Sequence, residues 1–214
     1  MSDIYLAEAD ASPQENHLLV FARVPALGRV KSRLAAGIGK EAALAIYQEL
    51  LAITRTAITQ SGVPTTVWMA DTAGPEPTAA EALEWNGMPT RCQEPGDLGQ
   101  RMTAAFAAAF AAGAERVAII GTDCPGLRDT HLTQAFALLA DHEVVLGPAT
   151  DGGYYLLGLS RPHPELFLNK AWSTESVLKD TVADAERLGS RVAFLPELHD
   201  VDTAADLEAW RSAS

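Results

Sequence analysis

The stretch Leu18–Leu34, LLVFARVPALGRVKSRL, decides how the rest of the chain is interpreted. It opens with an apolar run, residues 18–22, of the length expected for a strand buried on both faces. Pro25 and Gly28 then interrupt any regular element, and a helical pattern can begin within residues 30–34. The stretch therefore predicts a strand, a tight turn and the start of a helix.

Four cations fall within or beside this turn, in a chain that has only 16 Lys and Arg against 28 Asp and Glu. Backbone N–H groups and a helix N-terminus add to side-chain charge, so a basic strand-to-helix turn can hold phosphates. The turn matches neither the G-x-G-x-x-G pattern nor the Lys-Ser/Thr phosphate loop, and a solvated basic loop stays open as the alternative. The four cations are Arg23, Arg29, Lys31 and Arg33.

The composition narrows the class of protein. With 214 residues, 48% of them hydrophobic, the chain can bury one substantial core, and we expect residues 17–214 to form a single domain. The net charge of −12 disfavours nucleic-acid binding and favours a small anionic ligand in a local basic site. Cys92 and Cys124 suit neither a disulfide framework nor a metal site, so a cytoplasmic protein is expected.

Residues 1–16 are polar and are expected to fray rather than to form an anchor. No apolar run approaches the length of a membrane span. The sequence leaves the oligomeric state open.

Strand and helix patterns alternate along the chain and predict a three-layer α/β/α fold with a mostly parallel central sheet. The alternation is interrupted within residues 143–159, which indicates one antiparallel strand. In such sheets ligands bind beyond the carboxyl ends of the strands. Strands are expected at 18–22, 63–70, 90–93, 116–121, 143–147, 154–159 and 191–195, and helices at 40–60, 78–85, 98–112, 130–139, from after 174 to about 188, and after 203.

Asp123 is the strongest single candidate for chemistry. It follows the apolar strand 116–121 within a turn tightened by Gly121 and Pro125, so its carboxylate should project at the ligand-binding edge. Facing a phosphate site, a carboxylate can hold Mg²⁺ or Mn²⁺, which bridge a few carboxylates to substrate phosphates. The alternative is that Asp123 merely caps the next turn.

Three more carboxylates follow predicted strands. Asp151 begins Asp-Gly-Gly, where Gly152 and Gly153 permit close approach of a ligand, although Asp-Gly is also a common hairpin turn. Asp200 and Asp202 follow the last strand. Asp202 can cap the terminal helix. Thr203 can also do so, because Thr203 with Asp206 fits a capping box.

Two helix entries add candidates for binding. Arg101 lies in a helix start, against the helix dipole, which indicates a ligand or a buried partner for its guanidinium. Trp172, Ser173 and Thr174 can line an acceptor pocket, although an aromatic residue before a helix is more often a hydrophobic staple.

Several segments, in this order, resemble a family of small bacterial GT-A-like glycosyltransferases, some of them linked to arsenosugar biosynthesis. They are FARVPALGRVKSRL, GDLGQRM, GTDCPGL, LGPATDGGYYLLGL, WST and HDVDTAADL. The VKSRL and DVDTAADL pieces are also similar to nucleotidyltransferases such as phospholactate guanylyltransferase and the molybdenum-cofactor cytidylyl- and guanylyltransferases. Both groups share the nucleotide-diphospho-sugar transferase fold.

The resemblance implies that the first strand, loop and helix bind the nucleotide, with Lys31 and Arg33 near its phosphates. It implies that Asp123 is the metal-binding Asp and that Asp202 is the second metal ligand, with Asp200 as the alternative. The chain departs from the sugar-nucleotide pyrophosphorylases because its first loop lacks several glycines, and from the Asp-x-Asp pattern because GTDC has one Asp. The other predicted nucleotide- or substrate-binding residues are Ala22, Arg23, Gly28, Arg101, Thr122, Gly152, Gly153, Trp172, Ser173 and Thr174.

The sequence thus predicts a metal-dependent glycosyltransferase that uses a nucleoside-diphosphate sugar and a small-molecule acceptor. In this hypothesis Asp123 and Lys31 stabilise the diphosphate leaving group, and Asp151 orients or deprotonates the acceptor hydroxyl. Two alternatives remain open: a nucleotidyltransferase of the guanylyl or cytidylyl type, and a catalytically silent nucleotide-binding module.

Overall fold

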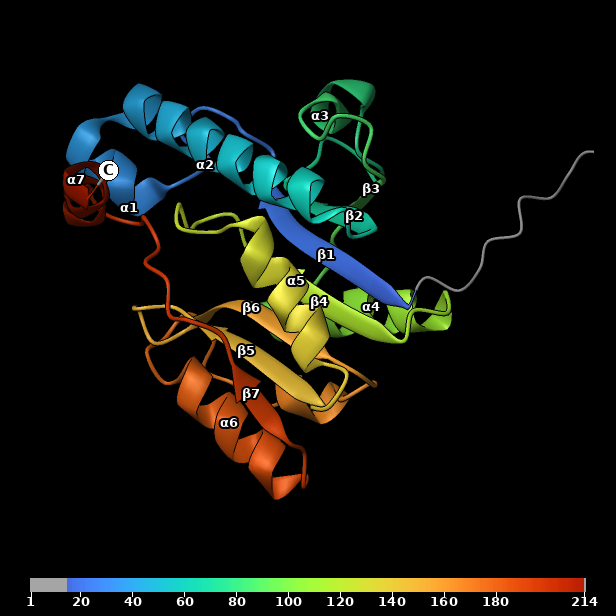
Figure 1. The fold of residues 1–214 in the computed structure, drawn as a ribbon. Helices are drawn as coiled ribbons and strands as arrows, with labels where there is room; N and C mark the ends of the chain where they lie inside the picture. The colour runs from blue at the N-terminus through green and yellow to red at the C-terminus, as the bar shows by residue number, and fades with distance from the viewer. Residues whose placement is uncertain (1–14, 214) are drawn as a thin grey trace, which may run out of the picture.

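The computed structural model describes residues 15–213, which form a seven-stranded sheet with helices on both faces (Figure 1). The strand order is β3-β2-β1-β4-β6-β5-β7. Most of the N-terminal segment expected to fray, residues 1–14, lies outside the described residues. The strands are β1 Asn16–Arg23, β2 Thr65–Ala70, β3 Thr90–Cys92, β4 Arg116–Ile120, β5 Val144–Pro148, β6 Tyr154–Leu159 and β7 Val192–Phe194.

The sheet is parallel except at β6, which runs antiparallel to both of its neighbours, β4 and β5. Leu159 at the end of β6 faces Val117 of β4 and Val144 of β5, near the starts of those strands. The remaining pairs, including β5 with β7, are parallel. The predicted mostly parallel sheet with one antiparallel strand is confirmed.

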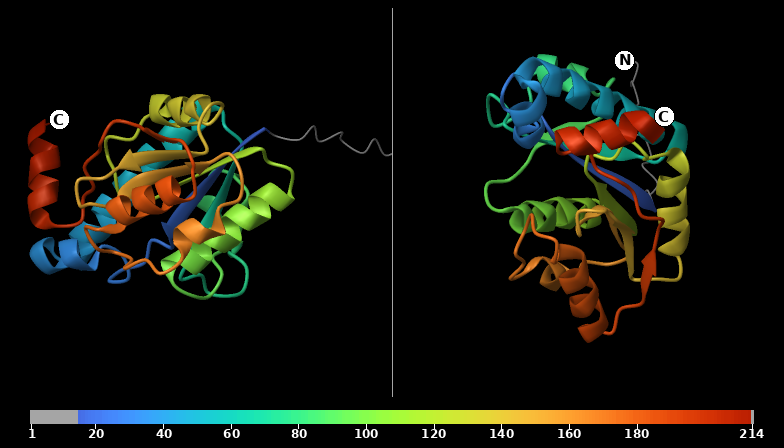
Figure 2. Two further views of the ribbon diagram at one scale, coloured as in Figure 1. Left: turned by 90° about the horizontal axis from the view of Figure 1, so that it is seen from below. Right: turned by 90° about the vertical axis from the view of Figure 1, so that its left-hand side faces the viewer.

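The helices cover both faces of the sheet, and successive residues of β1 pack against helices on opposite faces. Leu18 and Val20 belong to the core under α2 and α5, whereas Leu19 belongs to the core under α4 and α6. Figure 2 shows α4 and α5 on opposite sides of the sheet. The helices are α1 Ser32–Ile38, α2 Lys40–Ser61, α3 Ala79–Leu83, α4 Leu98–Ala111, α5 Asp129–Leu138, α6 Val177–Arg187 and α7 Ala204–Ala213, with a short 3₁₀ helix, η1, at Pro164–Phe167.

After β7 the chain crosses to the far side of the molecule, where α7 lies beside α1 (Figure 1). Val201 is buried there with Leu34 of α1 and Leu50 of α2, and Leu207 of α7 packs on this small core. This crossing carries residues 200–202 past the end of β4 and toward the basic turn after β1.

Pairing aligns the carboxyl ends of the strands that precede the candidate residues. Arg23, the last residue of β1, pairs with Ala70, the last residue of β2. Ile120, the last residue of β4, pairs with Val20 of β1. The turns after these strands therefore lie at one edge of the sheet. No helix within residues 15–213 is long and apolar enough to cross a membrane.

Candidate functional site

Lys31 lies at the centre of the candidate site and joins two of the predicted metal ligands. Its Nζ lies 2.6 Å from Asp123 Oδ1 and 2.8 Å from Asp202 Oδ1, and its side chain is only 5% exposed. Burial works to lower the pKa of this ammonium, but the two carboxylates outweigh it and the pKa is raised. Lys31 is therefore charged, buried and shared between two carboxylates.

The local backbone of Lys31 explains this position. The residue sits directly before α1 with φ 48° and ψ 50°, in the left-handed region that lysine rarely adopts. In this conformation its carbonyl still accepts the first helical bond, from Ala35 N at 2.8 Å. The side chain is meanwhile directed into the sheet edge rather than along the exposed side of α1.

Asp123 and Asp202 are brought together by the chain crossing after β7. Val201 N donates a hydrogen bond to the carbonyl of Asp123 at 3.0 Å, which fixes the two segments side by side. The predicted capping box is confirmed, since Thr203 N donates to Asp206 Oδ2 at 2.7 Å and Asp206 N donates to Thr203 Oγ1 at 3.3 Å. Because Thr203 caps α7, the carboxylate of Asp202 is available to the site.

The alternative capping role of Asp123 does not describe the structure. The N-cap position of α5 is held by Arg128, whose backbone N donates to Nδ1 of His131 at 3.0 Å. The side chain of Asp123 is instead 48% exposed and its nearest charged partner is Lys31. Its carboxylate thus faces the open sheet edge.

The two carboxylates can hold a divalent ion, since each places one oxygen within 2.8 Å of the same positively charged atom, Lys31 Nζ. Mg²⁺ is commonly held by one or two carboxylates together with substrate phosphates and water. No group of three or more His, Cys, Asp or Glu side chains among residues 15–213 is arranged to hold a metal. An ion at this point would therefore take most of its ligands from phosphate oxygens and water.

The other cations of the basic turn are distributed along the same edge. Arg33, 72% exposed, places Nη1 3.5 Å from Asp202 Oδ2 and thus belongs to the cluster. Arg23 Nη1 instead pairs with Asp71 Oδ2 at 2.5 Å, beyond the end of β2. Gly28 has φ 72° and lies against the side chain of Lys40, so a left-handed turn with little room explains this glycine.

Tyr47 is a residue that sequence reasoning did not assign to the site. Its hydroxyl accepts a hydrogen bond from Arg23 N at 2.9 Å and donates one to Arg23 O at 3.1 Å. Burial raises the pKa of this phenol, which also senses the charges of Asp123 and Lys31. Tyr47 thus fixes the backbone where β1 meets the basic turn. In the sequence, the one sign of this role is a polar hydroxyl on the face of α2 that is otherwise apolar and buried.

Ala22 and Thr122 are both buried at the sheet edge. The carbonyl of Ala22 accepts a hydrogen bond from Gln93 Nε2 at 3.4 Å, and Gln93 Nε2 also donates to Trp68 O at 3.0 Å. Gln93 therefore ties the ends of three neighbouring strands together. Direct contact of these two predicted residues with a nucleotide stays a prediction.

Asp151 lies near the cluster through Asp200. Burial raises the pKa of Asp200, and the negative charges of Asp151 and Asp202 raise it further. The carboxylate of Asp151 accepts a hydrogen bond from Gly153 N at 2.8 Å and is exposed. Cys124 lies beneath these groups, and burial followed by the charges of Asp123 and Asp200 raises the pKa of its thiol, which is therefore unreactive.

Gly152 is required by the chain itself. With φ 87°, it lies so close to Glu175 that an added Cβ would be 2.4 Å from the Glu175 carbonyl oxygen. Leu178 N donates to the carbonyl of Gly152 at 3.0 Å. The close approach at this glycine is thus made by the start of α6, and this contact fixes the Asp151 turn against it.

Arg101 has partners within its own loop. Its Nε donates to Gly96 O at 2.8 Å and its Nη1 to Gln93 Oε1 at 3.4 Å. A ligand or a buried partner was expected for this guanidinium, and the partners are a carbonyl and an amide of the loop after β3, neither of them on a buried residue. Binding of a ligand by Arg101 stays a prediction.

Trp172 is partly buried and packs against the first turn of α4. An added Cβ on Gly99 would lie 2.8 Å from Trp172 Nε1, so the two elements are in close contact. Ser173, with φ 65°, and Thr174 follow it and are exposed. Thr174 Oγ1 donates to Ala171 O at 2.7 Å. Whether these three residues line an acceptor pocket stays a prediction.

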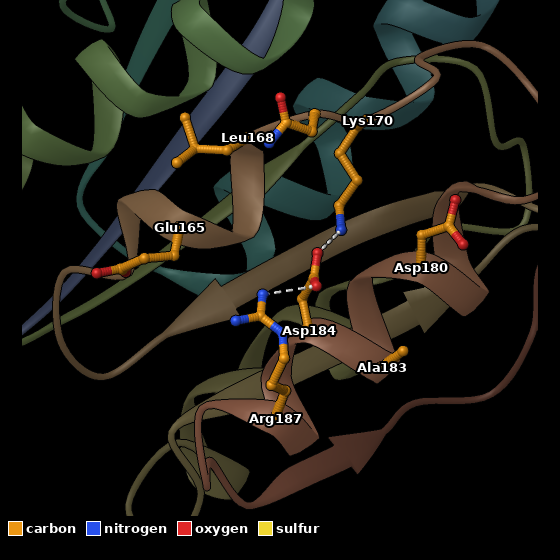
Figure 3. A pocket seen from close by; sticks show the side chains of 8 residues that line it. Glu165, Leu168, Lys170, Asp180, Ala183, Asp184 and Arg187 are labelled. Carbon is orange, nitrogen blue, oxygen red and sulfur yellow. Dashed lines mark hydrogen bonds and ion pairs between the residues drawn. The ribbon is translucent and has the colours of Figure 1, made fainter.

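A cavity of about 520 Å³ opens between η1 and α6, and none of the predicted site residues lines it (Figure 3). Asp184 there pairs with both Lys170 and Arg187. Three carboxylates and only two cations line the cavity, so its lining carries a net negative charge that disfavours a phosphate. Its lining consists of Glu165, Leu168, Asn169, Lys170, Asp180, Ala183, Asp184 and Arg187.

Residues 53–174 match the model of a protein family described as "Uncharacterized protein conserved in bacteria (DUF2064)". This segment contains Asp123, Asp151 and Trp172 but not Lys31 or Asp202. Among curated proteins, none is detectably similar in sequence.

Solved structures support the fold over nearly the whole chain. A protein from Desulfovibrio desulfuricans G20, assigned to the nucleotide-diphospho-sugar transferases, is 29% identical with a TM-score of 0.85, over 92% of this chain and 86% of that one. Rv0371c from Mycobacterium tuberculosis H37Rv, solved in complex with manganese, is 17% identical with a TM-score of 0.59, over 94% and 100%. The inositol-1-phosphate CTP transferase from T. maritima is 11% identical with a TM-score of 0.57, over 94% and 95%. The predicted nucleotide-diphospho-sugar transferase fold is thus confirmed.

Proposed function

We propose that this chain, which belongs to the bacterial family DUF2064, is a metal-dependent glycosyltransferase that moves a sugar from a nucleoside-diphosphate sugar to a small-molecule acceptor. The similarity to the Desulfovibrio protein supports a nucleotide-diphospho-sugar transferase of some kind.

One observation carries this proposal. Lys31, from the turn after β1, meets Asp123, from the turn after β4, and Asp202, from the segment after β7. A lysine, two carboxylates and an exposed arginine at the carboxyl edge of a mostly parallel sheet are a suitable set for a metal-bound diphosphate. The rest of this acidic chain would repel such a ligand.

The residues have distinct roles in the proposed reaction. Asp123 and Asp202 would hold the ion, which when bound neutralises negative charge that develops on the diphosphate leaving group. Lys31 and Arg33 would add positive charge beside the same phosphates. The manganese complex of Rv0371c supports a divalent ion in this fold, and either Mg²⁺ or Mn²⁺ suits the oxygen ligands.

The acceptor would enter from the side of Asp151. This carboxylate is exposed at the turn between β5 and β6, and its turn is braced by Glu175, two residues before α6. Asp151 would orient or deprotonate the attacking hydroxyl. Trp172, Ser173 and Thr174, which precede α6, would border the acceptor.

Nucleotidyl transfer is the second candidate, because the T. maritima CTP transferase has the same fold. In that reaction a phosphorylated substrate attacks a nucleoside triphosphate and pyrophosphate leaves. The first loop of this chain has one glycine, Gly28, so its backbone has little of the conformational freedom that lets a loop fold closely around a triphosphate. Glycosyl transfer requires this loop to bind a diphosphate rather than a triphosphate.

Product analysis tests the proposal. The purified chain is first screened by thermal shift against nucleotide sugars and nucleoside triphosphates, with and without Mn²⁺. Stabilising ligands are then incubated with candidate acceptors. Release of a nucleoside diphosphate supports glycosyl transfer, and release of pyrophosphate supports nucleotidyl transfer instead. Binding that is unaffected by loss of the Asp123 carboxylate, without turnover, would identify a silent binding module.

A further inference from the structure

We propose that the Lys31 ammonium is a built-in substitute for the divalent ion: it holds Asp123 and Asp202 together while the metal is absent and must leave them when the metal binds. The inference rests on the proposed function for the identity of the two metal ligands. It adds a role for Lys31 that precedes any contact with phosphate.

The contacts of Lys31 are those expected of a substitute cation. Its Nζ lies within hydrogen-bond distance of one oxygen from each carboxylate, at 2.6 Å and 2.8 Å. Each carboxylate would repel the other if that charge were removed. The amino group thus does for the pair what a metal ion would do, and it keeps both side chains aimed at one point.

The burial and backbone of Lys31 argue against an incidental surface pair. Exposed ion pairs are weakly held because long side chains move freely and water screens the charges. Lys31 is 5% exposed at its side chain, and its backbone is kept in the left-handed region where lysine is strained. A strained backbone persists only where its surroundings fix it, and here the surroundings are these two carboxylates and the start of α1.

A metal and the ammonium compete for the same oxygens. A divalent ion binds carboxylate oxygens at about 2.0–2.1 Å for Mg²⁺, closer than the ammonium lies now. Two cations on the same pair of oxygens would repel each other strongly in a partly buried site. Lys31 therefore leaves the carboxylates as the metal arrives, and its charge becomes available to the phosphates that accompany the ion.

This exchange predicts that the metal alone binds weakly to the native chain, because it must displace a cation that is already paired. Mn²⁺ binding without nucleotide is measured by electron paramagnetic resonance of the free ion and by calorimetry. We expect Lys31→Met to bind Mn²⁺ at least about tenfold more tightly than the native chain, since the competing charge is gone. Lys31→Arg, which keeps the charge, should stay close to the native affinity.

Two controls separate this effect from a general change in charge. Arg29→Met removes one cation from the same exposed turn and should change Mn²⁺ affinity by less than threefold. Asp123→Asn combined with Lys31→Met should lose the gain, which would show that the ion sits on these carboxylates. Equal or weaker Mn²⁺ binding by Lys31→Met, or a gain equal to that of Arg29→Met, would overturn the proposal.

A measurement on the native chain keeps the inference testable if Lys31→Met does not fold. A buried, paired ammonium exchanges its protons slowly enough to give a ¹H–¹⁵N signal for the lysine amino group. We expect this signal without metal and its loss or large displacement as Mg²⁺ saturates the site. A signal that stays unchanged at saturation would show that the metal binds the outer carboxylate oxygens while Lys31 remains in place, which contradicts the exchange. Neither experiment needs nucleotide, so both can be read even if no transferase activity is found.

Discussion

At the scale of single residues, the candidate site depends on Asp123 more than on any other side chain. Asp123→Asn keeps the size of the side chain but removes the charge that binds Lys31 and, by our proposal, the metal. We expect nucleotide binding in the presence of Mn²⁺ to fall at least about tenfold. The melting temperature without ligand should fall by no more than a few degrees, because Asp202 still pairs with Lys31.

Calorimetry with Mn²⁺ and a nucleoside diphosphate measures the first effect, and thermal unfolding measures the second. Glu76→Gln, which removes an exposed carboxylate from the loop after β2, is the matched control and should change neither quantity. Metal-dependent binding that survives in Asp123→Asn would remove Asp123 from the proposed metal site.

The sequence was informative about which residues carry charge, but not about how they are paired. Asp123 and Asp202 could be singled out because each follows a predicted strand. The left-handed backbone of Lys31 could not be predicted, since it follows from contacts made 92 and 171 positions further along the chain. Tyr47 could not be assigned to the site, because the sequence does not reveal that its hydroxyl bonds the backbone of Arg23.

At the scale of elements, the packing of α4 against the segment after η1 leaves no room for a side chain at Gly99. An added Cβ would meet Phe167 O at 2.7 Å and Trp172 Cζ2 at 2.8 Å. We expect Gly99→Ala to destabilise the fold by about 1–3 kcal/mol, despite the better helix propensity of alanine. Denaturant unfolding measures this loss.

Gly121→Ala is the matched control, since nothing lies within 4 Å of the Cβ that it would add. It should leave the free energy of unfolding within about 0.5 kcal/mol of the native value. A stable Gly99→Ala variant would mean that α4 and Trp172 are less closely packed than described.

The edge strand β7 is fixed to β5 by a pair whose strength depends on pH. The Arg191 side chain and backbone N–H both donate to the carboxylate of Glu143, and the side-chain hydrogen bonds are the main reason that the pKa of Glu143 is lowered to about 2. An unfolded Glu has a pKa of about 4.3. The folded chain therefore loses this proton more readily, so the pair stabilises fully above pH ~4.3 and loses its effect as the pH falls through the folded pKa of about 2.

We expect Glu143→Gln to lower the melting temperature by about 2–4 °C at pH 7, and the difference from the native chain to shrink below pH ~4.3 and to vanish only below pH ~2. Thermal unfolding of the variant and of the native chain, followed from pH 7 to below pH ~2, checks this expectation. A difference that stays constant with pH would show that the carboxylate charge contributes nothing.

Element types were largely predictable because periodicity and turn residues are local signals. The start of α2 at Lys40 was predicted, but the end of α1 at Ile38 was not, and the two helices meet at Gly39, which has φ 89°. The neighbours of each strand were beyond prediction as well. That β7 pairs with β5, and that β6 lies between β4 and β5, depends on long-range packing.

At the scale of the whole molecule, we expect the fold not to depend on the proposed metal. The hydrophobic cores on both faces of the sheet contain no metal-binding cluster among residues 15–213, and the charge of Lys31 already offsets part of the repulsion between the two carboxylates. We expect a chelator to abolish the thermal shift caused by nucleotide while leaving the melting temperature of the ligand-free chain within about 1 °C.

Thermal unfolding with and without EDTA, in the presence and absence of nucleoside diphosphate, measures both values. Restoring Mn²⁺ in excess over EDTA is the control and should restore the shift. A chelator that lowers the melting temperature of the ligand-free chain would indicate a structural ion and contradict this description.

The crossing from β7 to α7 has a consequence for how the protein matures. Ribosomes synthesise Lys31 and Asp123 long before Asp202, and the segment that brings Asp202 to them is held in place by α7 resting on α1 and α2. A nascent polypeptide that has not yet reached this crossing has no Asp202 carboxylate to complete the cluster around Lys31. Competence for catalysis would thus be acquired late in translation, and interrupted products would stay inert even if the sheet had already formed.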